Sequence, residues 1–177
     1  MNIQLITTIL SWITLIGQVF ILLLLLSLLH KNLRQRVAGV VHKHAIILSL
    51  AVVLLSVALS LFYSEIALYL PCRLCWFQRI FMYPQAVLFI VALFKKSRDV
   101  FYYALPLTLL GGLIALYHSI IQWVGLAQPG LSDACSATGT SCISTHFVSF
   151  GYITLPVMSF TAFVLLLIFA LVGRQKA

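Results

Sequence analysis

Charged residues are scarce in this chain, and acidic ones are nearly absent. Only 8% of the 177 residues are charged and three are acidic, whereas 63% are apolar. A soluble domain could not cover its surface with so few charges, so this composition excludes a soluble globular protein. The sequence also has no Gly-rich phosphate loop, no internal repeat and no low-complexity linker. Most of the chain must therefore face lipid.

Five apolar runs in the sequence are long enough to cross a bilayer, which takes roughly 17–25 helical residues. They cover residues 6–29, 45–69, 79–94, 100–124 and 153–172. No positive charge precedes the first run, and it is longer than the roughly 7–15 apolar residues of a signal peptide, so we expect a retained helix. The predicted fold class is therefore all-α integral membrane, with five transmembrane helices.

Lysine and arginine gather in three of the segments that flank these runs. Nine of the eleven lie there, namely Lys31, Arg34, Arg36, Lys43, Lys95, Lys96, Arg98, Arg174 and Lys176. Because short loops rich in these residues stay in the cytoplasm, the C-terminus should be cytoplasmic and the N-terminus outside. The net charge of +8 then reflects topology and contact with anionic membrane lipid, and it implies no nucleic-acid partner.

The segment 30–44 joins the first two runs and carries three histidines beside its basic residues. Such a segment could sense pH or bind metal, but a solvated basic cytoplasmic loop is the commoner structure. We therefore expect a loop here.

All four cysteines fall in the two longer outer segments that this topology predicts. Cys72 and Cys75 lie in the connection 71–78, and Cys135 and Cys142 lie in the loop 125–152. An even number of cysteines on the extracytoplasmic face is typical of an oxidising compartment, where disulfides form and persist. Two pairs are the simplest arrangement.

The spacing of Cys72 and Cys75, with two residues between them, is typical of redox-active thiols. A helix N-terminus and a nearby cation both stabilise a thiolate, and Arg79 lies one helical turn beyond Cys75. There are two alternatives. Arg79 could reach to lipid headgroups, and the two cysteines could form a static disulfide.

The second pair, Cys135 and Cys142, lies in a polar loop rich in Ser, Thr and Gly. A shuttle disulfide needs such a flexible loop because it must visit both a soluble partner and the first pair, whereas a structural staple is the alternative. Zinc binding by all four cysteines, or by a set that includes His146, is a further hypothesis. The spacing of the second pair departs from that of zinc knuckles, so we expect no metal.

His118 and Gln122 lie one turn apart near the outer end of the fourth run, so a helix presents both to one neighbour. In a membrane such a pair faces protein or a cofactor, or it forms hydrogen bonds between helices. Glu65 is an acidic residue near the outer end of the second run, where it could pair with Arg73 or Arg79 or face water.

The sequence PCRLCWFQRIFMYP at residues 71–84 resembles the signature of the DsbB family of disulfide bond formation proteins, and of its BdbC-like branch in particular. Further similarities are YSE at 63–65, GG at 111–112 with YH at 117–118, and GYITLP at 151–156. The resemblance runs from about residue 61 to the C-terminus. Vitamin-K-epoxide-reductase-like proteins place the loop cysteines first, whereas here the closely spaced pair comes first.

The resemblance implies a four-helix transmembrane bundle, residues 45–177, in the bacterial cytoplasmic membrane, preceded here by an extra helix and linker, residues 1–44. Cys135–Cys142 would take electrons from an extracytoplasmic thioredoxin-like protein of the DsbA/BdbD type. The same pair would pass them to Cys72–Cys75, and a membrane quinone, ubiquinone or menaquinone, would be the final acceptor.

The resemblance also implies roles for single residues. Cys75 would face the quinone and Arg79 would contact it, while His118 and Gln122 have a spacing that resembles the family's quinone-side histidine. The expected activity is that of a thiol:quinone oxidoreductase. The competing hypothesis is a non-catalytic membrane protein whose two disulfides brace its outer face.

Overall fold

The computed structural model describes residues 3–27, 31–127 and 141–174, except for the side chains of 31–34. In order, its helices are α1 (Ile3–Ser27), α2 (Lys31–Leu61), a short π-helix η1 (Phe62–Ile66), α3 (Arg73–Lys95), α4 (Val100–Ala127) and α5 (Leu155–Gly173). The five α-helices are long and apolar enough to cross a membrane. The predicted all-α, multi-pass membrane architecture is confirmed.

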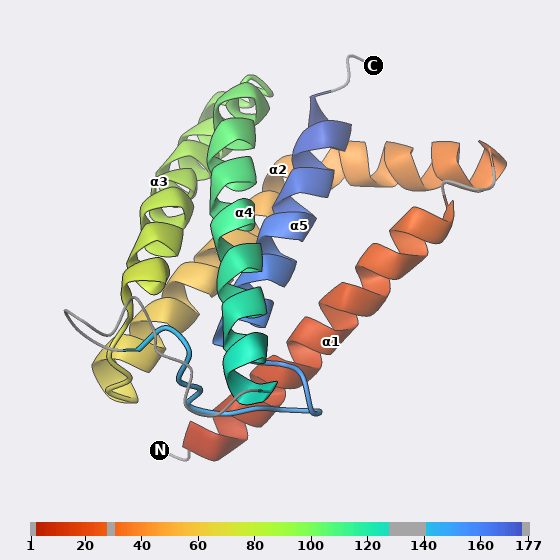
Figure 1. Cartoon of the computed structure of the whole chain (residues 1–177). Coiled ribbons are helices and arrows are strands. Elements are labelled where there is room, and N and C mark those ends of the chain that lie inside the picture. Colours follow the sequence, from red (N-terminus) through yellow and green to blue (C-terminus); the bar gives the residue numbers. More distant parts are fainter. Residues whose placement is uncertain (1–2, 28–30, 128–140, 175–177) are drawn as a thin grey trace.

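In the basic segment 30–44, residues 31–44 are not the loop that we predicted, because α2 begins at Lys31. The segment contains no proline, its Lys, Arg, Gln, Leu and Ala residues favour helix, and Gly39 is its weakest helix former. Polarity alone therefore does not end the helix. In Figure 1 this N-terminal part of α2, drawn in orange, extends sideways from the other helices.

The start of α3 also differs from the prediction, since the helix begins at Arg73 rather than at residue 79. Cys72 is its N-cap residue and has an extended backbone. The polar residues Arg73 and Gln78 shorten the apolar run, so hydropathy places the boundary too late. Hydropathy indicates only which residues suit lipid. The helix itself also includes polar residues that contact protein, such as Gln78.

Helices α2, α3, α4 and α5 pack around one apolar core. Each helix contacts two of the others, in the order α3, α4, α5, α2 and back to α3. The largest buried side chains of the core are Phe89, Phe101, Phe163 and Leu166. A Cβ on Gly111 would lie 2.4 Å from the Phe163 ring, so glycine at this position lets α5 pack directly on α4. Helix α1 lies outside this bundle against α5 and α2 (Figure 1).

The segments that we predicted to share the cytoplasmic face meet at one end of the bundle. His42 Nδ1 lies 3.0 Å from the carbonyl oxygen of Val172. Arg98, between α3 and α4, donates to the carbonyls of His42 and Gly173 at 3.0 and 3.4 Å. The N-terminus of α3, with the cysteine pair, lies at the opposite end together with the N-terminus of α1 (Figure 1).

Candidate active site

The first turn of α3 holds the cysteine pair. Cys72 is the N-cap residue and Cys75 lies three residues further, so the helix brings both sulfurs to the same side. Their Sγ atoms are 3.1 Å apart, and both residues are thiols. Cys72 is buried and Cys75 is partly exposed. The pair therefore lies at the N-terminus of α3, where the helix dipole is positive, and is largely covered by protein.

His118 reaches the cysteine pair from α4 and is only 2% exposed. Its Nε2 lies 3.7 Å from Cys72 Sγ and 3.2 Å from the carbonyl oxygen of Cys142. Its Nδ1 lies 2.9 Å from the amide nitrogen of Gln78. Because an amide nitrogen only donates and a carbonyl only accepts, the partners fix a neutral imidazole with its proton on Nε2.

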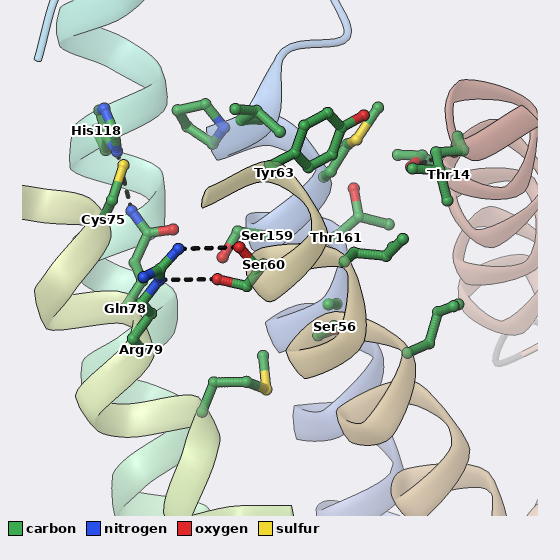
Figure 2. Close-up of a pocket in the computed structure, with 18 of the residues that line it drawn as sticks. Thr14, Ser56, Ser60, Tyr63, Cys75, Gln78, Arg79, His118, Ser159 and Thr161 are labelled. Atoms are coloured by element: carbon green, nitrogen blue, oxygen red, sulfur yellow. Dashed lines mark hydrogen bonds between the residues drawn. The ribbon is translucent and has the colours of Figure 1, made fainter. Parts of the chain in front are cut away.

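Arg79 points from α3 toward α2 and is held there by one residue. Its Nε donates to Ser60 Oγ at 2.8 Å and its Nη2 donates to the Ser60 carbonyl at 2.9 Å. The guanidinium carbon also lies 5.2 Å from the centre of the Trp76 ring, a cation–π distance. Figure 2 shows these two bonds next to the Gln78–His118 contact. Since a guanidinium has five N–H donors, this anchoring does not use all of them.

The cysteine pair and Arg79 line a cavity of about 530 Å³ that all five helices surround. Figure 2 shows its labelled residues on α1, α2, α3, α4 and α5. Tyr83 and Gln122 also line it, and among the described residues the buried Tyr83 Oη and Gln122 Oε1 have no hydrogen-bond partner. Gln122 donates from its amide nitrogen to the Ser144 carbonyl at 3.0 Å. Unpaired buried polar atoms are costly, so these two side chains are the ones with spare hydrogen-bonding capacity next to the cavity.

An aromatic cluster forms part of the cavity wall near the cysteine pair, through Tyr63, Tyr69 and His146. Tyr63 in the π-helix η1 stacks on Tyr69 and on Phe147, with ring centroids 5.7 and 5.9 Å apart. His146 stacks on Tyr69 at 4.2 Å, and burial lowers the pKa of this histidine. The cluster therefore ties the end of α2 to the loop before α5. π-helical turns are frequent at functional sites.

The pKa of the Cys72 thiol differs from its ordinary value. Its hydrogen bond to Cys75 and its burial raise the pKa of the Cys72 thiol to about 12, against the weaker opposite effect of His118. At neutral pH, Cys72 therefore keeps its proton.

Five of the residues that we singled out from the sequence line one cavity: Cys72, Cys75, Arg79, His118 and Gln122. The Cys142 backbone lies against His118, whereas Cys135 lies outside the described residues. Glu65 accepts a hydrogen bond from Ser64 at 3.0 Å, whereas Arg79 contacts Ser60 and Trp76.

Three residues of the site were missed at the level of sequence: Ser60, Gln78 and Tyr83. Gln78 could have been identified, because an amide three residues after a cysteine in a membrane helix needs a polar partner, and Gln78 is indeed buried. Ser60 gave none, because a serine in a membrane helix usually bonds its own backbone.

Two thiols and one imidazole also form a cluster of metal-ligand type within the described ranges. The ligand atoms of Cys72, Cys75 and His118 all lie within 4.8 Å of one another. This set differs from the zinc sets weighed above, because it contains His118 in place of His146, which stacks on Tyr69. Such a cluster could bind a soft cation when reduced, and its thiols could equally exchange with a disulfide.

Comparisons with known proteins found a matching family and similar chains. The family model "Disulfide bond formation protein DsbB" matches residues 42–173. A "Probable disulfide formation protein" of Metapseudomonas resinovorans is 35% identical over 131 residues, which is 74% of this chain and 90% of the relative. "Disulfide bond formation protein C" of Bacillus subtilis is 37% identical over 122 residues, or 68% and 86% of the two chains.

A third relative is the "Probable disulfide formation protein C" of Halalkalibacterium halodurans, 40% identical over 119 residues, or 66% and 84% of the two chains. No solved structure matches this chain.

Proposed function

Because this chain belongs to the DsbB family of disulfide bond formation proteins, we propose that it reoxidises an extracytoplasmic thioredoxin-like protein and passes the electrons to a membrane quinone. The observation that carries the proposal is the meeting of the Cys72–Cys75 thiols with Arg79, His118 and an apolar cavity inside a membrane bundle. A thiol:quinone oxidoreductase needs a dithiol, a cation and a lipid-accessible pocket together.

The first step on this chain's own residues is thiol–disulfide exchange. In the oxidised protein, Cys72 and Cys75 form a disulfide, which an incoming thiolate opens through a mixed disulfide. When the pair is reduced, its sulfurs lie 3.1 Å apart, against about 2.05 Å in a disulfide, so a small rotation of two side chains brings them to bonding distance, and the bond closes when two electrons and two protons pass to the quinone. Each cycle takes two electrons and two protons from the incoming dithiol.

The two cysteines divide the charge between them. Cys72, with its raised pKa of about 12, keeps its proton and donates to Cys75. Cys75, three residues into α3, then carries the negative charge, where the helix N-terminus and the Arg79 guanidinium stabilise it. Cys75 is therefore the sulfur from which we expect electrons to leave the protein.

The residues of the cavity suit a quinone. A bound quinone supplies an acceptor for two electrons and two protons. Arg79 offers N–H donors to a ring oxygen, and Tyr83 and Gln122 line the same cavity with side chains that could turn a donor and an acceptor toward the ring. The remaining wall is largely apolar, as a ring with a hydrocarbon tail requires. Whether ubiquinone or menaquinone is used depends on the membrane.

His118 is suited to hold a proton next to the pair. Its Nε2–H lies 3.7 Å from Cys72 Sγ and is shared with the Cys142 carbonyl, and Gln78 fixes the ring orientation through Nδ1. We assign to it an N–H donor that stabilises negative charge on the Cys72 sulfur when the pair opens and closes, without transfer of the proton.

The donor side of the reaction is assigned to Cys135–Cys142. Cys142 lies next to His118 through its backbone, which brings the loop within reach of the first pair. We expect Cys135→Ser to lower oxidation of a reduced thioredoxin-like donor at least roughly 10²-fold. Oxidation of the small thiol dithiothreitol should continue, because dithiothreitol can reach Cys72–Cys75 directly. The measurement is loss of donor thiols and of dithiothreitol with quinone present, and Ser136→Ala is the control in the same loop.

An unchanged rate with the protein donor in Cys135→Ser would show that electrons enter without the loop pair. Loss of both activities would show that Cys135 is needed for folding, in which case a matched loss of thermal stability should accompany it.

Orientation and location follow from the two ends of the bundle. The basic segments around His42, Arg98 and Gly173 meet at the end opposite to the cysteines. By the positive-inside tendency, we propose that this end faces the cytoplasm and the cysteines face outward, in a bacterial cytoplasmic membrane. A protein whose disulfides only brace its outer face would not need Arg79 and an apolar cavity beside a thiol pair, so we do not favour that alternative.

A further inference from the structure

Helix α1 contributes one face to the cavity that holds Cys75 and Arg79. The residues on this face follow helical spacing: Leu10, Ile13, Thr14, Gly17 and Phe20. They oppose apolar residues of α2 and α5, among them Leu55 and Leu165. Thr14 marks the α1 side of the cavity in Figure 2, and Arg79 and Cys75 mark the other side. The cavity therefore has a polar end at α3 and an apolar end at α1.

Hydroxyl groups near the α1 end do not call for a polar ligand. Thr14 donates to the carbonyl of Leu10 at 2.9 Å, one turn earlier in its own helix. Ser56 and Thr161 do the same in α2 and α5, at 2.8 and 2.9 Å. These back-bonds leave mainly carbon atoms on the wall. By contrast, the unpartnered Gln122 Oε1 and Tyr83 Oη belong to α4 and α3.

Polar bonds tie α1 to its place against the bundle. Gln18 donates to Thr161 Oγ1 at 3.2 Å and accepts from the Tyr152 hydroxyl at 2.6 Å. The Tyr63 hydroxyl donates to Thr7 Oγ1 at 3.2 Å. A membrane helix that served only as an anchor would have no need of hydrogen bonds to three other segments.

We infer that α1 is a wall of a compartment for the isoprenoid tail of the quinone, with Gly17 and its neighbours on α1 in contact with the tail. This inference rests on the proposed function. It gives the segment 1–44, most of which lies outside the matched family region 42–173, a role in substrate binding. A phospholipid acyl chain has the same apolar chemistry, but only a quinone also has a ring that can reach the polar end of the same cavity.

Gly17 is the position at which the tail compartment can be blocked. A Cβ there would lie 3.5 Å from Leu165 Cδ1 and 3.6 Å from Thr161 Cγ2, which is ordinary contact, so a larger side chain enters the cavity without a backbone clash. Gly39→Leu is the matched control, because a Cβ on this exposed α2 residue meets nothing within 4 Å.

The experiment compares equilibrium binding of a prenylated quinone and of a tail-less quinone with the same ring. In Gly17→Leu, we expect binding of the prenylated quinone to weaken by about tenfold or more, since several tail carbons lose their burial, and binding of the tail-less quinone to stay unchanged. Gly39→Leu should bind both as wild type does. Equal weakening for both quinones in Gly17→Leu would overturn the inference.

A second measurement uses the unaltered protein, so it does not depend on how a variant folds. A prenylated quinone with a photoreactive group on its tail should label the α1 peptide 3–27, and unlabelled prenylated quinone should compete. Absence of label on α1 overturns the inference, as does label that phospholipid displaces but prenylated quinone does not. Failure of the proposed function would look different, because wild-type protein would then bind quinone without reducing it.

Discussion

Quinone reduction by the Cys75→Ser protein is expected to fall at least roughly 10³-fold, to the uncatalysed rate, because the atom that gives up the electrons is gone. Serine preserves the size of the side chain, and Cys75 is partly exposed, so folding should be little affected. Beyond the one equivalent that the Cys135–Cys142 disulfide can oxidise, the reduced donor should also stay reduced, since no disulfide can form between Cys72 and Ser. The measurement is the anaerobic change in quinone absorbance with a reduced thioredoxin-like donor.

Cys72→Ser serves as the comparison for that experiment. It also removes the disulfide, but it leaves Cys75 beside Arg79, so a single thiolate should still form there. Titration with a thiol reagent should therefore modify Cys75 in Cys72→Ser faster at neutral pH than it modifies Cys72 in Cys75→Ser. Equal reactivity would contradict the division of charge between the two sulfurs. Full activity of Cys75→Ser would remove that residue from the electron path.

Replacing Arg79 by methionine is expected to lower quinone reduction by about 10²–10³-fold, as loss of one donor to a developing oxyanion does in other enzymes. Methionine keeps a long apolar stem beside Trp76, while the charge and the bonds to Ser60 are lost. Exchange between the donor and the cysteine pairs should continue for one turnover. Stopped-flow measurement of single-turnover donor oxidation, next to steady-state quinone reduction, separates the two steps.

Two controls separate the charge of Arg79 from its structural contacts. Arg73→Met removes a charge from the exposed first residue of the same helix and should change the rate by no more than about threefold, as a screened surface charge would. Ser60→Ala keeps the guanidinium but removes one of its anchors, so the loss should be smaller than in Arg79→Met. A rate in Arg79→Met equal to that in Arg73→Met would contradict the role of Arg79.

The sequence correctly predicted the five helices wherever the chain has a long apolar run. Long apolar runs can lie in lipid only as helices, because each backbone polar group must be bonded within its own segment. The same reasoning failed at 31–44 and at 73–78, where polar residues continue a helix. Hydropathy cannot detect such extensions, since the partners that accept these polar residues, such as His118 for Gln78, belong to other helices.

The sequence predicted which candidate site residues come together, but not the residues that position them. Cys72, Cys75 and Arg79 follow one helical face, so local spacing was enough to bring them together. The bond from Arg79 to Ser60 joins residues 19 positions apart on different helices, and the Thr7–Tyr63 bond joins residues 56 positions apart. Such pairs depend on how helices pack. For the same reason the tail compartment lined by α1 has no signature in the sequence.

The measurement that tests the central claim most directly is the stoichiometry of the anaerobic reaction of the wild-type protein in detergent. With a reduced thioredoxin-like donor and a prenylated quinone, one donor disulfide should form for each quinone reduced, through many turnovers, with the protein's four cysteines unchanged at the end. If donor thiols are consumed only up to the amount of protein disulfide present while no quinone is reduced, the protein is not a thiol:quinone oxidoreductase.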